Sequence, residues 1–552
     1  MVLPALSTVV AVLIIFGLLF ALLHRPWTAA AITLYVICFV LLISVVKQSY
    51  LGVAATLADV VFFLLHPKEN FHLFIHYPLL GMALLLVITG FVSCLVAGLK
   101  FERAIHHRVG PAHRYWMRLT AAATSLVLGT GALHITSAAS HGEVSEGIVF
   151  NAFESMYELQ NVNGIVARLN AFFSNRSMEP TLPSMRTQQR FKSLEANTLA
   201  IQTASENYPD IFMVLEESTF DSTIVGNCDP AQCDNAMLHP LNMSARTQQG
   251  PLVVHSTGGG TWLSEFAFMS GFDWRVFGRG GAYAPVSIAP RLQEALPAHL
   301  RKLGYRTIAL CPTGGNFLSA QTAYQSYGFD EFYAADELKL TNDWMMLYDR
   351  TMFEHALRIA QNDNDPRPVF VFVLTIRNHG PHGEGAIKLS SEFQKAQTKH
   401  GPYLADYLER MRDSSNDFTQ VAKQWLSSSR PRVIGWFGDH QPEAAWDVTQ
   451  HHELLQRDRV ATNVTEAQIE YLTHYQFSAN FGDHQQSISQ EAMDISYLGS
   501  QLVAFAGLTP TAGEQAAREV AATCHGMMIT CSNRELINDY LSYRIHELHE
   551  IN

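Results

Sequence analysis

Long runs without an acidic or basic residue dominate the first 135 of the 552 residues. Residues 2–23 contain no Asp, Glu, Lys or Arg, and residues 27–46, 78–99 and 119–135 have the same character. A helix that rises about 1.5 Å per residue needs roughly 20 such residues to cross a hydrocarbon layer of about 30 Å. Residues 51–66 form a weaker fifth run, because Asp59 would cost a few kcal/mol in lipid unless it faces a partner. The sequence therefore predicts a transmembrane domain, 1–136, with four or five helices.

The orientation of these helices follows from the loop between residues 99 and 119. Its charged residues are five basic side chains and one acidic side chain: Lys100, Arg103, Arg108, Arg114, Arg118 and Glu102. Basic loops stay on the cytoplasmic side. Residues 2–23 lack the basic start and the cleavage site of a signal peptide, so we expect a retained anchor. The chain is thus predicted to be integral to the inner (cytoplasmic) membrane, with everything after residue 135 on the periplasmic side.

The charge balance separates the rest of the chain from this first part. Residues 1–150 hold 8 Lys and Arg against 5 Asp and Glu, whereas the whole chain has a net charge of −12, which leaves −15 for the remainder. An acidic surface argues against nucleic acid as a partner. The cysteines agree with an oxidising compartment, since Cys228 with Cys233 and Cys524 with Cys531 form two close pairs that could be disulfides. Free thiols in a cytoplasmic protein are the alternative.

Residues 137–206 form neither a span nor a clear core pattern, and we interpret them as a linker. Within it, residues 152–173 carry apolar side chains at helical spacing. Such a stretch suits a helix on the membrane surface, or an ordinary packed linker helix.

From residue 207 to 552 the pattern indicates an α/β domain with a mainly parallel central sheet. Short continuous apolar runs, which are typical of strands buried on both faces, occur at 211–215, 307–310, 369–374 and 433–437. Helix-like segments occur around 291–303, 320–327, 349–360 and 404–425. Strands and helices in alternation form parallel sheets, which bind ligands beyond the carboxyl ends of their strands.

Three of these strand ends are followed by side chains that bind metals. Glu216 and Glu217 follow the first run, Asn378, His379 and His382 follow the third, and Asp439 and His440 follow the fourth. Carboxylates with imidazole suit Zn²⁺ or Mn²⁺, and three protein ligands leave room for a reacting group. Each string alone would be an ordinary hydrogen-bonded turn, but packing gives no reason for three of them at one edge.

A nucleophile is predicted at Thr261, which follows Gly258, Gly259 and Gly260 and precedes an apolar helical stretch. We expect Thr261 to be the N-cap of this helix, where free N–H groups and the helix dipole favour an alkoxide and a bound phosphate. The glycines would let the backbone approach a ligand closely.

Other candidates carry less weight. A second Gly-Asp-His-Gln string at 482–485 follows a weaker strand, so we interpret Asp483 and His484 as surface residues. His382 and His474 remain candidates for proton transfer or for a second, weaker metal.

Five strings, taken in order, resemble the sulfatase-like phospho-alcohol transferases of the alkaline phosphatase superfamily. The strings are 215–218 (Leu-Glu-Glu-Ser), 260–266 (Gly-Thr-Trp-Leu-Ser-Glu-Phe), 327–333 (Tyr-Gly-Phe-Asp-Glu-Phe-Tyr), 375–381 (Thr-Ile-Arg-Asn-His-Gly-Pro) and 437–442 (Phe-Gly-Asp-His-Gln-Pro). This group includes lipoteichoic acid synthases, phosphoethanolamine transferases and glucan phosphoglycerol transferases. The resemblance covers roughly residues 209–507.

The resemblance implies roles for individual residues. The metal, Mn²⁺, Zn²⁺ or Mg²⁺, would be held by Glu217, Thr261, Asp439 and His440. Thr261 would be the nucleophile, and His379 would touch the transferred phosphoryl group or handle a proton, with His382 and Trp262 as further substrate contacts. Glu216 would not be a ligand. Where the synthases carry an Arg that grips glycerol phosphate, residues 316–321 read Asn-Phe-Leu-Ser-Ala-Gln, so the guanidinium is absent.

These roles imply a membrane transferase. It would move phosphoethanolamine or phosphoglycerol from a phospholipid donor, through phospho-Thr261, to an envelope glycan or lipid acceptor. A hydrolase with the same site is the alternative, although no Cys/Ser-x-Pro-x-Arg string of sulfatases occurs here. A binding module that has lost activity would require a broken ligand set, and all four metal positions carry workable ligands.

Overall fold

A computed structural model describes most of the N-terminal apolar helices and most of the C-terminal domain. The described residues are 2–23, 25–51, 55–57, 59–60, 78–105, 120, 123, 190–191, 208–315, 317–341, 346–361, 365–383, 385–445, 449 and 452–552. The chain divides into two compact units, Met1–Met178 and Glu179–Asn552. The division falls inside the linker expected at 137–206. The helix expected at 152–173 and the span expected at 119–135 lie outside the described residues, apart from two positions in the latter.

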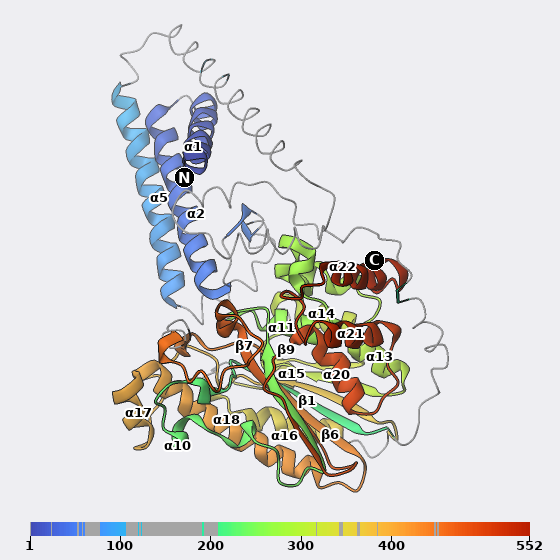
Figure 1. The fold of residues 1–552 in the computed structure, drawn as a ribbon. Coiled ribbons are helices and arrows are strands. Elements are labelled where there is room, and N and C mark those ends of the chain that lie inside the picture. Colours follow the sequence, from blue (N-terminus) through green and yellow to red (C-terminus); the bar gives the residue numbers. More distant parts are fainter. Residues whose placement is uncertain are drawn as a thin grey trace. The chain divides into compact units, whose positions relative to one another are not determined.

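Most of the described residues of the first unit lie in the helices α1 (Val2–Leu23), α2 (Pro26–Leu51) and α5 (Pro78–Ile105). They coincide with three of the expected spans (Figure 1). Large apolar side chains on them are exposed, for example Leu22 at 75% and Leu86 at 70%. Among the described residues, α2 contains the one helix long and apolar enough to cross a membrane, over Pro26–Val45. Exposed apolar surfaces of this kind are unfavourable in water and favourable in contact with lipid.

Asp59, the acidic residue in the weak fifth run, has the partner that its position requires. Its carboxylate lies 2.7 Å from Lys47 Nζ, near the end of α2, and both side chains are nearly buried. Pairing offsets the cost of removing both charges from water.

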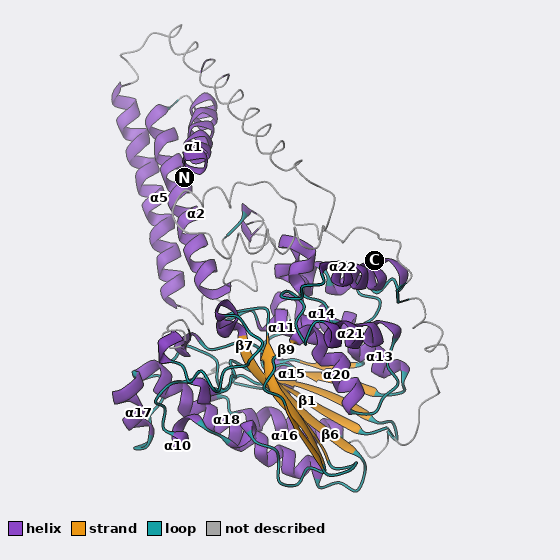
Figure 2. Cartoon of the chain, viewed as in Figure 1, coloured by secondary structure: helices purple, strands orange, loops and turns teal. Residues whose placement is uncertain are grey.

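The second unit is built on a mixed sheet with the order β4-β3-β5-β1-β6-β7-β2-β8, with β9 paired to β2 (Figure 2). Its strands are β1 (Asp210–Glu216), β2 (Arg246–Val253), β3 (Arg306–Leu310), β4 (Glu331–Tyr333), β5 (Val369–Leu374), β6 (Arg432–Gly438), β7 (Leu472–Ala479), β8 (Gln485–Ile488) and β9 (Met493–Asp494). Every neighbouring pair is parallel except the two pairs that β7 makes with β6 and β2. The prediction of an α/β domain with a mainly parallel sheet is confirmed.

Helices cover both faces of this sheet. The principal ones are α11 (Thr261–Ser270), α13 (Leu296–Lys302), α14 (Ala320–Tyr327), α16 (Asp349–Ala360), α17 (Phe393–His400), α18 (Pro402–Leu426), α20 (Leu498–Phe505), α21 (Ala512–Thr523) and α22 (Arg534–Ser542). Short helical segments include α10 (Pro230–Cys233), α12 (Ala284–Ser287) and α15 (Ala335–Leu338). The helix expected at 291–303 is shorter than predicted, because Pro297 has no N–H and fits only the first turn of α13.

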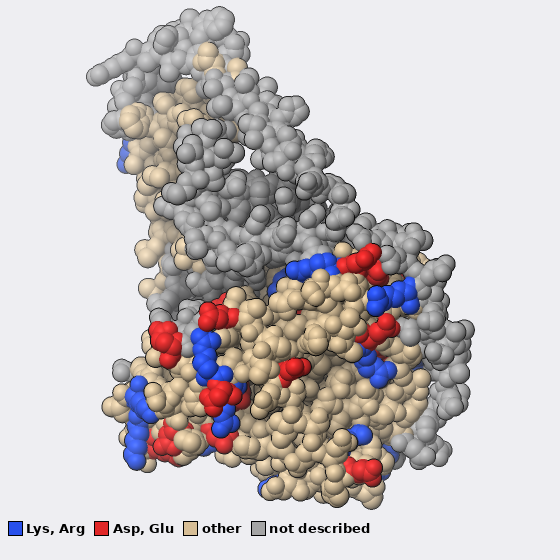
Figure 3. Space-filling model, in the orientation of Figure 1, with Lys and Arg blue, Asp and Glu red and all other residues tan. Residues whose placement is uncertain are grey.

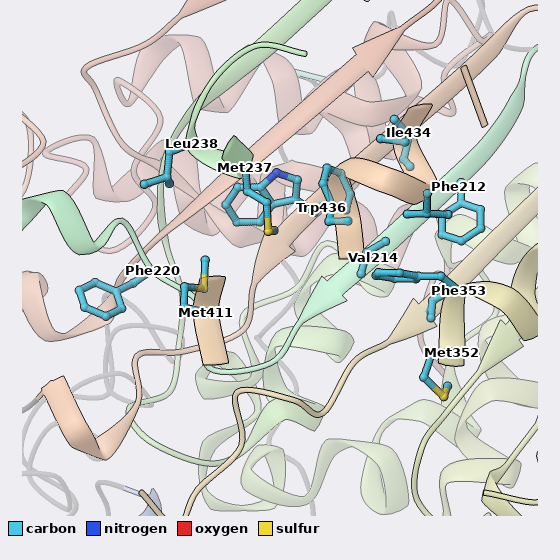
Figure 4. Close-up of a cluster of buried hydrophobic side chains, with 14 of the residues drawn as sticks. Phe212, Val214, Phe220, Met237, Leu238, Met352, Phe353, Met411, Ile434 and Trp436 are labelled. Atoms are coloured by element: carbon cyan, nitrogen blue, oxygen red, sulfur yellow. The ribbon is translucent and has the colours of Figure 1, made fainter. Parts of the chain in front are cut away.

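One face of the sheet packs against α16 and α18. Phe212 and Val214 of β1 and Trp436 of β6 lie in one buried cluster with Phe353 of α16 and Met411 of α18 (Figure 4). All five side chains are at most 2% exposed. Because alternate residues of a strand face opposite sides, the odd-numbered residues of β1 are buried on the opposite face of the sheet.

The opposite face packs against α11 and α14. Phe268 of α11 stacks on Phe372 of β5 with ring centroids 5.7 Å apart and lies 4.8 Å from Phe437 of β6. Tyr324 of α14 contacts the same Phe372 ring. Helix α11, which begins at Thr261, is thereby fixed over the central strands.

Strand β2 was not predicted and β7 was expected only as a weaker strand before residue 482, and their polar residues explain why. Gln249 of β2 and Gln476 of β7 are both buried, and the Gln476 amide donates to Gln249 Oε1 at 2.7 Å. Buried polar side chains that satisfy each other leave no apolar run in the sequence.

Both predicted cysteine pairs are disulfides, Cys228–Cys233 and Cys524–Cys531.

On the face of the α/β unit seen in Figure 3, Lys and Arg side chains are interspersed with Asp and Glu.

Candidate active site

The parallel pairing of β1 with β6 brings Glu217 and Asp439 together. Glu216 pairs with Gly438 in the register, so the next residue of each strand leaves the sheet at the same edge. Asp439 Oδ1 accepts hydrogen bonds from the backbone N–H of Ser218, at 2.7 Å, and of His440, at 2.9 Å. Both carboxylates are buried. Sheet geometry alone therefore creates a pair of acidic groups at the carboxyl edge.

His440 presents Nε2 to the same point. Its Nδ1 lies 3.0 Å from the Gln441 carbonyl oxygen, which can only accept, so Nδ1 carries a proton. Nε2 lies 3.2 Å from Asp439 Oδ2 and 3.6 Å from Glu217 Oε1, and the Gly259 N–H points at it from 3.0 Å. Because Nδ1 donates to a carbonyl, Nε2 is the acceptor nitrogen, and a metal would take the position from which the Gly259 N–H now donates, which is the usual arrangement of a ligating histidine.

Thr261 completes the cluster. The expectation that Thr261 is the N-cap of α11 is wrong by one residue, because Gly260 is the N-cap, with φ of 89°, and Thr261 is the first helical residue. Gly258, Gly259 and Gly260 all have positive φ, a conformation that residues with a Cβ rarely adopt, and the helix begins one residue earlier than predicted. The Thr261 hydroxyl donates to Glu217 Oε2 at 3.3 Å.

The residues present fit a divalent cation. One ligand atom each from Glu217, Asp439 and His440 lie within 4.8 Å of one another. Asp439 Oδ2 is buried, and it lies 3.2 Å from His440 Nε2. Two buried carboxylates this close together are unfavourable without a positive charge between them. Oxygen and nitrogen donors of this kind suit Zn²⁺ or Mn²⁺.

The electrostatics agree with this fit. Burial, together with repulsion from Glu217, raises the pKa of Asp439 to about 7. Burial opposes a charge on His440, but Asp439 and Glu217 outweigh it and raise the pKa of His440 above its ordinary value. Protons and a divalent cation therefore compete for the side chains of Asp439 and His440.

Glu216 is turned away from the cluster, as the resemblance implied. Its Oε2 accepts from the Thr375 hydroxyl at 3.0 Å, and burial, then repulsion from Asp349, raises its pKa well above the ordinary value.

Glu265 lies one turn after Thr261 on α11, and the sequence assigned it no role. The Tyr324 hydroxyl donates to Glu265 Oε2 at 2.7 Å. Burial raises the pKa of Glu265 to about 7, and Asp439 and Glu217 add to the effect. Only the packing of α14 against α11 reveals this group.

The loop after β5 carries His379 and His382. His379 is half-buried, and its Nδ1 lies 2.7 Å from the Gly380 carbonyl oxygen. His382 Nε2 donates to the Asn378 carbonyl oxygen at 3.1 Å, and its ring meets the Tyr407 ring edge-on. Burial, then the positive charge of Arg410, lowers the pKa of His382 to about 3, so this ring is neutral. The substrate and proton roles of both residues stay predictions.

The remaining candidates have defined surroundings. The Trp262 indole N–H donates to the Ala282 carbonyl oxygen at 3.0 Å, so its substrate role stays a prediction. His474 is buried on β7 and stacks on Trp436 with centroids 5.8 Å apart. Asp483 and His484 are exposed, as expected of surface residues.

The second unit contains a segment that is similar to a known protein family. Residues 209–469 match the family model described as Sulfatase, and this segment contains the whole cluster of Glu217, Thr261, Asp439 and His440. This part of the chain is therefore similar to the Sulfatase family.

Two curated proteins are similar to this chain in sequence. An uncharacterized protein of Haemophilus influenzae is 30% identical over 368 residues, which cover 64% of this chain and 62% of that protein. A putative cyclic beta-1,2-glucan modification protein of Rhizobium meliloti is 24% identical over 254 residues, 44% of this chain and 37% of that protein. The chain thus spans about three fifths of the first relative's length and about a third of the second's.

Two solved structures are also similar. The phosphoglycerol transferase GacH of Streptococcus pyogenes gives a TM-score of 0.48 at 16% identity and covers 66% of this chain and 95% of its own. The lipooligosaccharide phosphoethanolamine transferase EptA of Neisseria meningitidis gives 0.43 at 12% identity and covers 88% of this chain and 85% of its own.

Proposed function

We propose that this chain is a metal-dependent membrane transferase. It moves phosphoethanolamine or phosphoglycerol from a phospholipid to a hydroxyl of a cell-envelope glycan or lipid, through a phospho-Thr261 intermediate. The observation that carries the proposal is the Thr261 hydroxyl, which donates to Glu217 beside Asp439 and His440. The match to the sulfatase model and the order of the five sequence strings support it.

The nucleophile is prepared by its surroundings. The three glycines turn the chain so that Thr261 starts α11 at the positive end of the helix dipole, where a phosphate and an alkoxide are stabilised. Glu217 accepts the Thr261 hydrogen bond and orients the oxygen. When bound, a divalent ion would supply Lewis-acid stabilisation of negative charge at this point, held by Glu217, Thr261, Asp439 and His440.

The reaction takes two displacements. Thr261 Oγ forms a bond to the phosphorus of the headgroup, the bond between phosphorus and the diacylglycerol oxygen breaks, and the Thr261 proton ends on diacylglycerol. An acceptor hydroxyl oxygen then forms a bond to the phosphorus of phospho-Thr261, the bond between phosphorus and Thr261 Oγ breaks, and the acceptor's proton ends on the restored threonine. We assign proton handling to His379, whose Nδ1 is held by the Gly380 carbonyl oxygen and whose ring is only half-buried.

Location and acceptor belong to the same proposal. The exposed apolar helices α1, α2 and α5 would hold the chain in the inner membrane, where the donor lipid lies beside the periplasmic domain. The name of the Rhizobium meliloti relative supports a glycan as one acceptor class. A hydrolase that passes the phosphoryl or sulfuryl group to water is the alternative, which the sulfatase match favours.

Intact-mass analysis of the full chain in detergent tests the proposal. The protein is exposed to phosphatidylethanolamine or phosphatidylglycerol with Mn²⁺ or Zn²⁺, and Thr261→Ala and Thr261→Ser are run in parallel. We expect an adduct with the mass of one headgroup phosphate from one lipid, absent in Thr261→Ala and retained at a reduced rate in Thr261→Ser. Turnover of a simple phosphate or sulfate ester, with no adduct from either lipid, would instead establish the hydrolase.

A further inference from the structure

A buried ion pair on α18 faces the loop that carries His379. Arg410 is 0% exposed and Asp406 is 1% exposed. Arg410 Nε lies 2.7 Å from Asp406 Oδ1, and Nη2 lies 2.9 Å from Asp406 Oδ2, so the pairing is bidentate. A pair this deeply buried is costly unless its remaining hydrogen-bonding groups are also satisfied.

Both members of this pair also make hydrogen bonds with one short segment, residues 379–383. Arg410 Nη1 donates to the His379 carbonyl oxygen at 2.8 Å, and Nη2 donates to the Pro381 carbonyl oxygen at 3.0 Å. Asp406 Oδ2 accepts from the Gly383 N–H at 2.9 Å. The pair therefore holds residues 379, 381 and 383, three alternate positions of a five-residue loop.

The next turn of α18 fixes the start of the same loop. The Ser414 hydroxyl donates to Asn378 Oδ1 at 3.2 Å, and Asn378 Nδ2 donates to the Thr219 hydroxyl at 3.1 Å. Thr219 follows Glu217 at the end of β1, so this chain of contacts connects α18 to the segment that supplies a metal ligand.

We propose that Arg410, oriented by Asp406, is a positioning residue that sets the backbone of His379 for the phosphoryl transfer. The proposal rests on the proposed function for the reaction, and on the observed contacts for the clamp. A guanidinium is required because only a planar fork can reach a carboxylate on one side and two carbonyl oxygens on the other. A lysine at 410 would keep the charge and lose this simultaneous reach.

The test is Arg410→Lys in the full chain, with Arg306→Lys as a matched control. Arg306 is also buried, pairs with both oxygens of Glu331, at 2.6 and 3.0 Å, and donates to the Ile359 carbonyl oxygen. It is the first residue of β3 and so lies at the amino ends of the parallel strands, whereas Glu217 and Asp439 follow the carboxyl ends. The two substitutions therefore break equivalent contacts at a functional and a remote position.

Hydrogen–deuterium exchange measures the clamp without any substrate. The His379 N–H donates to the Ile376 carbonyl oxygen and the Gly383 N–H to Asp406, so both amides are protected. We expect Arg410→Lys to speed exchange in a 378–383 peptide by about tenfold or more, which is about 1.4 kcal/mol, and Arg306→Lys to leave it unchanged. Equal exchange in both variants would overturn the clamp.

The rate of phospho-Thr261 formation at saturating donor measures the consequence for the reaction. A displacement of about 1 Å costs on the order of 100-fold, so we expect that loss for Arg410→Lys with little change in donor concentration dependence. In a His379→Ala background, Arg410→Lys should add less than about twofold, because the effect acts through His379. Full additivity, or a loss no larger than in Arg306→Lys, would overturn the proposal. If the wild type turns over esters without an adduct, the proposed transferase fails, and the same comparison is made on that turnover.

Discussion

The Ser264 hydroxyl donates a 2.6 Å hydrogen bond to the backbone carbonyl oxygen of Asp439. Ser264 lies in the first turn of α11, three residues after Thr261, and Asp439 directly follows β6. The helix that begins at the proposed nucleophile thus also holds the backbone of a proposed metal ligand. A change in one of these groups is transmitted to the other through a single contact.

Ser264→Ala should weaken metal binding by about tenfold, because contacts that orient ligands typically contribute 10- to 100-fold in affinity. Calorimetric titration of the full chain with Zn²⁺ or Mn²⁺ measures the change. Ser270→Ala is the matched control, since Ser270 lies on the same helix, is buried and donates to the Phe266 carbonyl oxygen at 2.6 Å. Equal affinity in the two variants would contradict a role for Ser264.

Metal affinity should depend on pH. The pKa of Asp439, raised to about 7, means that a proton occupies this carboxylate increasingly as the pH falls from 8 to 6. A metal must displace that proton, so affinity should fall by up to about tenfold per pH unit below 7. Titration in buffers of different ionisation enthalpy counts the protons released. An affinity that is constant over this range would rule out the linkage.

Glu265→Gln should stabilise the metal-free protein at alkaline pH. The pKa of Glu265 is raised from 4.5 to about 7 by burial, so folding favours its protonated form. That contribution is complete below the unfolded pKa and is lost as the pH rises through 7. The variant cannot ionise, and it should gain about 2–3 kcal/mol at pH 8.5 and less than about 1 kcal/mol at pH 5.

Thermal unfolding in chelator at the two pH values measures this difference. Glu331→Gln provides the opposite case. Partial burial raises the pKa of Glu331, but hydrogen bonds from Arg306 and Tyr333 outweigh it and lower that pKa. The control should therefore be destabilised rather than stabilised at alkaline pH. A pH-independent effect of Glu265→Gln would refute the assigned shift.

The membrane orientation is testable by fusion. A reporter that is active only outside the cytoplasm should be active when joined after residue 206 and inactive when joined within the basic loop, after residue 110. Activity at both points, or at the loop alone, would contradict a periplasmic catalytic domain. Expression of both fusions is checked by immunoblot so that an inactive reporter is distinguished from a missing one.

Much of the site followed from local pattern. The apolar runs of β1 and β6 identified buried parallel strands, and parallel strands end at one edge, so Glu217 and Asp439 were expected to meet. The glycine run before an apolar helix identified Thr261. Its place as first helical residue rather than N-cap was missed, because backbone conformation at Gly260 depends on how the whole turn fits above the strands.

Other elements could not be predicted, because their signals are spread over distant residues. Strand β2 gave no signal and β7 only a weak one, because they bury Gln249 and Gln476 against each other and neither segment alone is apolar. Glu265 acquires its raised pKa only when α14 covers it with Tyr324.

The sequence by itself indicated the membrane-type segments, the α/β class and the metal-binding side chains at three strand ends, since these depend on periodicity and on residue type. The set of Glu217, Thr261, Asp439 and His440 as metal ligands was implied by the resemblance to the transferase family. The tertiary structure decided which nitrogen of His440 faces the cluster and that Arg410 holds the His379 loop. Both depend on hydrogen bonds whose direction and partners arise only when the backbone is folded. Residue type defines what chemistry is available, and packing defines where each donor and acceptor points.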